Sequence, residues 1–196
     1  DALLSRGLGD VYKRQAIGHD ALKSTTTGGQ NNAFGDGTME ANTTGCRNVA
    51  MGNAAMIKNT EGECNVAIGY RALICNVTTD NNTAVGAGAL DKNTASDNTA
   101  VGYNAAACTT TGADNVAMGS CALDSNTTGA SNVAIGYSAL TTNTTAASNT
   151  AVGHLALRYN TTGTQNTAVG KSAMTANTSG GYSVAVGNNA LQAQTT

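Results

Sequence analysis

The sequence predicts an all-β protein, a parallel β-solenoid (β-roll) of about eleven 17-residue coils, from three observations. Eleven glycines follow one another at steps of 17 residues, with one step of 16 before Gly102. Every one of them is preceded by Ala and then by a larger apolar residue. The 196 residues include no proline, which would interrupt a continuous hydrogen-bond ladder. A fixed period of this length is typical of one unit stacked on copies of itself. The glycines are Gly18, Gly35, Gly52, Gly69, Gly86, Gly102, Gly119, Gly136, Gly153, Gly170 and Gly187.

We number each repeat from its glycine, position 0, so that the unit reads Asn-x-Ala-x-Gly-x-x-Ala-Leu-x-x-Asn-Thr-Thr-Gly from position −4 to position +10. After Gln15, no charged residue falls at positions −4 to 0, +3, +4, +7 or +8. These positions are therefore expected to be interior. The variable positions +1, +2, +5, +6, +11 and +12 are expected to face solvent.

The first segment, residues 1–15, does not fit the repeat. Arg14 and Gln15 stand where later repeats have Asn and then Val or Thr. The stretch from Arg6 to Gln15 resembles translated adapter sequence, so we expect 1–15 to be a non-native or disordered leader. An irregular capping segment is the alternative. The solenoid domain is expected to span 16–196, with the natural start and any export signal outside this sequence.

Within each repeat, positions −4 to 0 predict a strand, because short β-branched runs bounded by Asn, Thr and Gly are typical of strands. A helix is disfavoured by a glycine in every unit. Positions +3 to +5 predict a second short strand or extended segment, and Asn-Thr-Thr-Gly at +7 to +10 predicts a corner. The residue missing from the one short repeat lies between Asp91 and Asn98, in that corner. Coils about 4.8 Å apart would give a rod of roughly 50 Å.

Two asparagine columns are expected to form hydrogen-bonded ladders along the rod, because stacked amides can bond to their own copies. Position +8 is Thr in ten repeats and Val77 in the other. The predicted ladder at −4 comprises Asn31, Asn48, Asn65, Asn82, Asn98, Asn115, Asn132, Asn149 and Asn166. The ladder at +7 comprises Asn42, Asn59, Asn76, Asn126, Asn143, Asn160 and Asn177.

The predicted strand is apolar on both faces, with Ala at −2 pointing one way and the larger residue at −1 the other. A strand buried on both sides needs cover on both sides. We expect the coil's own core on one side and a partner chain on the other, with the alanine permitting a close approach. This predicts an oligomer.

The Asn-Val-Ala-Ile-Gly motif, as in 65–69 and 132–136, resembles the Ser-Val-Ala-Ile-Gly head repeats of trimeric autotransporter adhesins. The longer Asn-Thr-Ala-Val-Gly unit looks like repeats in bacterial surface proteins and phage tail-fibre proteins. The resemblance covers residues 16 to about 194, although the period of 17 is longer than that of the adhesin heads. It implies three parallel left-handed β-rolls around one axis, hence a homotrimer, and no catalytic residues.

Other chemistry is weakly indicated. Val169-Gly170-Lys171-Ser172 imitates the end of a phosphate-binding loop, but Gln165 replaces the required glycine. His19 and His154 lie eight coils apart, roughly 38 Å along the rod. Five cysteines fit neither a zinc pattern nor a disulfide framework, so most are expected to be free. The net charge of −2 predicts no nucleic-acid partner, and no apolar run is long enough for membrane insertion. We expect no cofactor and no metal.

The sequence therefore predicts a non-enzymatic structural or adhesive fibre segment of a bacterial surface adhesin or phage tail fibre. Such a segment would lie outside the cell, on a cell surface or virion, and present a repetitive surface to a host protein or glycan. Tyr70, Tyr103 and Tyr137 at position +1 are the recognition candidates, because aromatic residues dominate contacts, with incidental surface residues as the alternative. The rival functions are an ice-binding solenoid, from the threonine column, and a polysaccharide-acting β-helix enzyme.

Overall fold

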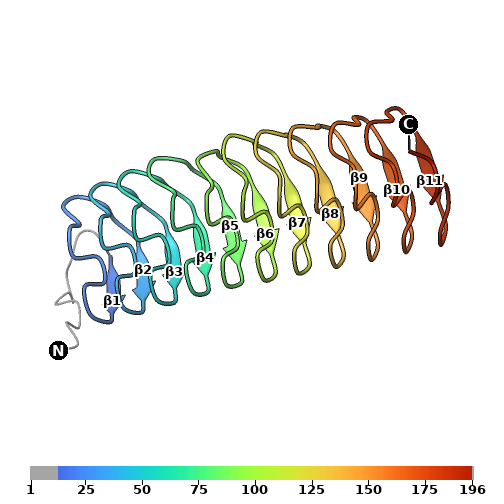
Figure 1. Cartoon of the computed structure of the whole chain (residues 1–196). Helices are drawn as coiled ribbons and strands as arrows, with labels where there is room; N and C mark the ends of the chain where they lie inside the picture. The colour runs from blue at the N-terminus through green and yellow to red at the C-terminus, as the bar shows by residue number, and fades with distance from the viewer. Residues whose placement is uncertain (1–12, 196) are drawn as a thin grey trace.

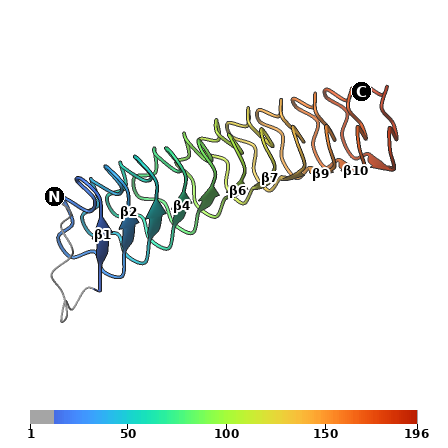
Figure 2. The same ribbon diagram turned by 90° about the horizontal axis from the view of Figure 1, so that it is seen from below.

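The computed structural model describes residues 13–195 as a row of stacked coils, and no helix occurs among these residues. Figures 1 and 2 show the coils following one another from the N-terminal to the C-terminal end, with all strands on one side. The all-β parallel solenoid predicted from the sequence is confirmed. The strands are β1 Gln15–Ile17, β2 Asn32–Phe34, β3 Val49–Met51, β4 Val66–Ile68, β5 Thr83–Val85, β6 Thr99–Val101, β7 Val116–Met118, β8 Val133–Ile135, β9 Thr150–Val152, β10 Thr167–Val169 and β11 Val184–Val186.

The strands form one eleven-stranded sheet in which each strand pairs in parallel with its neighbours in sequence. The register is constant: Ala67 lies opposite Ala84, and Ala84 opposite Ala100 across the short repeat. The missing residue therefore does not shift the sheet and is absorbed in the corner. The strands cover positions −3 to −1 only, so they are shorter than the predicted −4 to 0. Residues 1–12 of the predicted leader, 1–15, lie outside the described residues. Gln15, at the end of the predicted leader, pairs with Asn32 in the sheet.

The predicted second strand at +3 to +5 is wrong, because this segment consists of consecutive turns. In one coil, Ala72 N–H donates to the Gly69 carbonyl at 3.2 Å, while Leu73 N–H donates to the next coil at Ala89. Positions +2 and +4 have positive φ in every repeat, 57° at Arg71 and 54° at Leu73. Bulky residues rarely adopt this conformation. The bonds to the next coil hold it in place.

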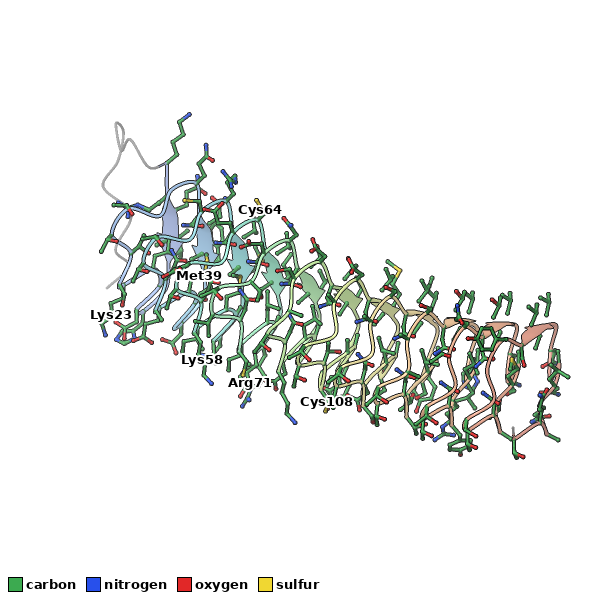
Figure 3. All side chains as sticks on the ribbon, turned by 90° about the horizontal axis from the view of Figure 1, so that it is seen from above. Lys23, Met39, Lys58, Cys64, Arg71 and Cys108 are labelled. Atoms are coloured by element: carbon green, nitrogen blue, oxygen red, sulfur yellow. The ribbon has the colours of Figure 1, made fainter. Side chains whose placement is uncertain are left out.

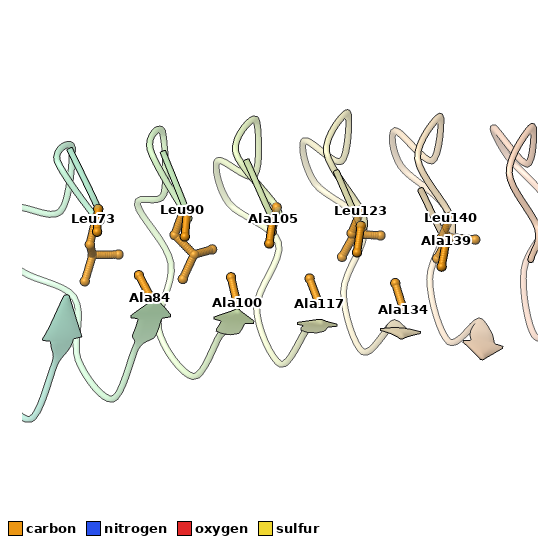
Figure 4. Packing of buried hydrophobic residues seen from close by; sticks show 14 of the residues in the cluster. Leu73, Ala84, Leu90, Ala100, Ala105, Ala117, Leu123, Ala134, Ala139 and Leu140 are labelled. Atoms are coloured by element: carbon orange, nitrogen blue, oxygen red, sulfur yellow. The ribbon is translucent and has the colours of Figure 1, made fainter. Parts of the chain in front are cut away.

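The core is a narrow apolar column between the strands and the turn segment. Ala at −2 and +3 and Leu or Met at +4 face one another there, as Ala84 and Leu90 do (Figure 4). The strand alanines from Ala33 to Ala168 are fully buried in the coil's own interior. The expectation that alanine faces a partner chain is therefore wrong. The small side chain leaves room for the leucines opposite, and positions −3 and −1 form the outer face of the sheet.

Glycine at position 0 is required by both conformation and space. Gly136 has φ 129°, which side-chain-bearing residues rarely adopt, and a Cβ there would lie 2.6 Å from the Gly153 carbonyl of the next coil. The invariant glycine therefore ends the strand and sets the close stacking of one coil on the next.

Candidate functional site

The asparagines at position −4 form one continuous hydrogen-bonded ladder. Asn48 N–H donates to Asn31 Oδ1 at 2.9 Å, and Asn31 Nδ2 donates to the Gly45 carbonyl at 2.7 Å. The same backbone-to-amide bond recurs through the series to Ser183, which donates to Asn166 at 3.1 Å. Eight of the nine amides thus satisfy one backbone N–H and one backbone carbonyl, while Asn82 Nδ2 donates to the Thr79 hydroxyl instead. All nine asparagines predicted for this ladder take part.

The asparagines at position +7 form a second ladder, which is interrupted. Asn59 Nδ2 donates to Asn42 Oδ1 at 2.8 Å, and Asn143 Nδ2 donates to Asn126 Oδ1 at 2.9 Å. Between these two runs, Thr109 occupies the column and its buried hydroxyl has no hydrogen-bond partner. Asn93 also stands in the column, but its amide donates within its own shortened corner, to Ala95. The weak point of the ladder therefore coincides with the short repeat.

The threonines at position +8 are also engaged within the stack. Thr43 Oγ1 donates to the Thr60 carbonyl at 3.0 Å, and Thr127 Oγ1 donates to the Thr144 carbonyl at 3.0 Å. Hydroxyls that bond along the rod are not free to form a flat array toward ice. The threonine column therefore has a structural role of the kind that corner threonines provide.

The outer face of the sheet is an exposed apolar band. Position −1 supplies a large apolar side chain in every coil, and Met118 and Ile135 are 41% and 36% exposed. Val, Thr and, in two coils, Gln15 and Asn32 flank this column at −3. The band runs along eleven strands, about 50 Å at a spacing of 4.8 Å. Only the column at −1 is apolar in every coil, because six of the eleven residues at −3 are polar.

A hollow lies on the surface between Tyr70 and Tyr103, two of the three predicted recognition residues. It has a volume of about 260 Å³ and is lined by Tyr70, Arg71, Ala87, Gly88, Asp91, Tyr103 and Asn104. The two tyrosines stand two coils apart at position +1, with Ala87 between them, and they are 58% and 59% exposed. We call this hollow the tyrosine slot.

Gly88 makes the floor of the slot. It has φ 69°, and a Cβ there would lie 2.4 Å from Asn104 Oδ1. In the next gap along the same column, between Tyr103 and Tyr137, position +2 is Cys121 instead of glycine. A glycine at this variable position therefore distinguishes the lining of the slot from that of the next gap.

Polar groups gather at the rim of the slot. Arg71 donates to the Asp91 carboxylate at 3.4 Å, and both side chains are solvent-accessible. The pKa of Arg71 is raised, first by the Asp91 carboxylate and next by the hydrogen bond that Arg71 donates to the Tyr70 side-chain oxygen. Arg71 projects from the side of the rod that faces away from Cys64 (Figure 3). The paired charges leave the rim close to neutral.

Tyr137 stands apart from the slot. Its ring stacks on His154 of the adjacent coil, with centroids 5.4 Å apart and planes 19° from parallel. A second contact that the sequence did not predict is Arg158 over the ring of Tyr159 at 5.1 Å. His19 lies far from His154 and instead contacts Asp36 at 3.2 Å. Stacking of one coil on the next brings the two histidine contacts together, whereas Arg158 and Tyr159 are neighbours in the sequence.

The remaining reactive side chains are dispersed. All five cysteines are free, and Cys75 and Cys108 accept contacts from Lys58 and Lys92 at 3.8 Å. The pKa of Asp124 is raised by burial, against an opposing effect of Lys92. Residues 13–195 contain no group of three His, Cys, Asp or Glu side chains arranged for a metal ion. Over the same range, no helix is long and apolar enough to span a bilayer.

Comparisons with protein-family models, with curated proteins and with solved structures give no match for this chain.

Proposed function

We propose that this chain is a non-enzymatic segment of an extracellular fibre, in which copies associate through the outer sheet face as a homotrimer. The exposed apolar band along that face carries the proposal. Its residues at −1 repeat in every coil, so one complementary contact is repeated along the whole rod. The fibre would belong to a bacterial surface adhesin or a phage tail.

The composition of the band supports association of identical chains. It contains no charged side chain at −3 or −1. A partner therefore needs an equally apolar surface of the same length, and a second copy supplies one. Parallel packing of copies would bring equal positions of successive coils together, as expected of a symmetric oligomer.

The other faces support a display function. Charged residues occupy variable positions outside the strands, and the five tyrosines that follow residue 13 stand at +1, +6 or +12. They remain accessible to a host protein or glycan when the sheet face is covered. The charged residues are scattered through the coils rather than paired in one cleft, as an acid/base enzyme would require. This distribution favours binding over catalysis.

Sedimentation equilibrium of the purified chain at micromolar concentration tests the oligomer. We expect a trimer, and a variant carrying Met118→Lys and Ile135→Lys is expected to be monomeric, because each lysine would be desolvated in the contact. The matched control carries Thr128→Lys and Thr145→Lys, which add the same charges to the same two coils at exposed position +9. A monomeric parent chain, or equal dissociation of both variants, would overturn the proposal.

A further inference from the structure

We propose that the tyrosine slot binds one neutral pyranose ring of a surface glycan, held between Tyr70 and Tyr103 above Ala87 and Gly88. The inference rests on the proposed display function only for the biological source of the glycan. The slot itself is argued from its walls, its floor and its rim.

The walls have the right separation. Tyr70 and Tyr103 are separated by two coil steps, about 9.6 Å at the spacing of stacked strands. Backbone bonds confirm the stacking, since Gly88 N–H donates to the Tyr70 carbonyl at 3.0 Å and Asn104 N–H to the Ala87 carbonyl at 3.0 Å. Carbon atoms in contact lie about 3.5–4.0 Å apart, so two contacts take up about 7–8 Å. A puckered saturated ring fills the remainder better than a flat one.

The column also allows the ring orientation that such walls need. At the same position +1, Tyr137 stacks face to face on His154 in the adjacent coil. Rings in this column can thus turn their faces along the rod axis. Tyr70 and Tyr103 have only Ala87 between them, and their rings would flank a bound ring with both faces. The apolar C–H faces of a pyranose match such walls.

The rim selects for a neutral ligand with hydroxyl groups. Arg71 offers donors, the Asp91 carboxylate offers acceptors, and the Asn104 amide offers both. Because Arg71 and Asp91 neutralise each other at 3.4 Å, neither a cation nor an anion is favoured. An aromatic hydrocarbon side chain would fill the gap but form no hydrogen bonds with Arg71, Asp91 and Asn104. Hydroxyls around a sugar ring can pair with all three.

The size of the slot limits the ligand to one ring. Its volume of about 260 Å³ lies below the range of about 300–1,000 Å³ typical of sites for drug-sized ligands. An open site of this kind is expected to bind a single sugar with a dissociation constant in the millimolar range. A trimeric fibre would present three copies and strengthen attachment to a glycan-coated surface through multivalency.

Saturation-transfer NMR with methyl glucopyranoside, methyl galactopyranoside and methyl mannopyranoside tests the slot on the full chain. We expect at least one glycoside to bind and both Tyr70→Ala and Tyr103→Ala to weaken it at least about tenfold, the equivalent of about 1.4 kcal/mol. Tyr103→Phe keeps the ring and should retain binding. Tyr137→Ala, at the same position outside the slot, should leave binding unchanged.

Ala87→Tyr is a second variant that leaves both walls in place. Tyrosine occurs naturally at position +1 in three coils, so the fold accepts it, and its ring would occupy the gap. We expect it to abolish binding. Failure of all three glycosides to bind the parent chain, or unchanged binding in Ala87→Tyr, would overturn the proposal. Binding of N-acetyltyrosinamide in place of the glycosides would also overturn it, since an aromatic partner would then be favoured.

Sedimentation of the same samples separates this inference from the proposed oligomer. The substitutions at position +1 lie off the outer sheet face, so they should leave the oligomeric state unchanged. Glycoside binding by a monomeric parent chain would contradict the trimer but support the slot. A trimer that binds no glycoside would support the proposed oligomer and contradict the slot.

Discussion

The amide of Asn59 donates to the side-chain oxygen of Asn42 at 2.8 Å, one coil away, and both side chains are fully buried. Asn59 also donates to its own Gly62 carbonyl at 3.2 Å, so one amide links two coils and closes a corner. The same amide-to-amide bond joins Asn76 to Asn59, and it recurs in the second run, from Asn143 to Asn177. Several consequences for stability can be measured.

Asn132→Ala should destabilise the solenoid by about 1–3 kcal/mol, because it leaves buried groups without partners. Asn132 Oδ1 accepts from Asn149 N–H at 3.0 Å, and its Nδ2 donates to the Ala146 carbonyl at 2.9 Å. Urea unfolding followed by circular dichroism measures the loss. Asn81→Ala is the control, because Asn81 has an exposed bond to Asp97. If both variants had the same free energy of unfolding, the ladder would not be contributing to stability.

Thr109→Asn should stabilise the chain by about 0.5–1.5 kcal/mol. It replaces a buried hydroxyl that has no partner with an amide positioned between Asn93 and Asn126 in the same column. The new amide could donate to the Gly112 carbonyl, as Asn126 does to Gly129 at 2.9 Å. Thermal denaturation compares it with Thr111→Asn at an exposed position. A lower melting temperature for Thr109→Asn would show that the corner next to the short repeat cannot accommodate the longer side chain.

Gly136→Ala should cost about 3 kcal/mol or more, since a strained φ alone costs about 1–3 kcal/mol. The new Cβ would also meet the Gly153 carbonyl at 2.6 Å. Gly187→Ala, at position 0 of the last coil, is the matched comparison, because its φ of 130° is similar while a Cβ there would meet only Ala190 Cβ, at 3.9 Å. We expect denaturant unfolding to show a smaller loss for Gly187→Ala. Equal losses would mean that the contact with the next coil adds nothing to the conformational cost at position 0.

Leu140→Ala should destabilise the protein by about 2–5 kcal/mol through the cavity it leaves. Leu140 is fully buried and faces the strand alanines (Figure 4). Leu155→Ala removes the same atoms at position +2, where the side chain is only half-buried, and should cost less. Equilibrium unfolding of both variants checks the difference. Similar losses would place Leu155 in the core as well.

Asp124→Asn should raise stability at neutral pH. Burial raises the pKa of Asp124, so its ionised form is less favourable in the folded state than in the unfolded chain. Stability therefore falls as the pH rises through the titration of this carboxyl group, and it is fully retained below the ordinary value of 3.8. Melting curves should show the benefit of asparagine near neutral pH and its disappearance in acid. A benefit that is independent of pH would exclude the carboxylate as its cause.

Periodicity alone was enough to predict the solenoid and both asparagine ladders. Because parallel stacking places each residue on its copy, a column of identical polar residues has one evident set of partners. The interruption at Thr109 was visible in the sequence, but its unpaired hydroxyl was not. That depends on how the neighbouring corner, shortened by one residue, redirects the amide of Asn93.

The turn segment could not be predicted from local preference. Leu73 and Leu140 both have φ 54°, which leucine rarely adopts, and only stacking with neighbouring coils compensates for it. The orientation of the strand was also predicted wrongly, because Ala-x alternation fits either face equally well. The leucines at +4 determine which face of the strand is turned inward. They fill the interior, so only a residue as small as alanine fits opposite them. Tyr70 and Tyr103 were predicted as surface residues, but the slot between them requires Gly88.

The constant register of the sheet has a consequence for the gene. Because most coils present the same kind of strand, a glycine and an asparagine to the next, two such coils that are distant in the rod can be joined with the same contact between them. Recombination between repeats could thus remove or duplicate whole coils, each changing the length by about 4.8 Å while conserving the joint. The length of the rod would then be inherited and would change by whole coils, while the exposed side chains along the rod diverge independently.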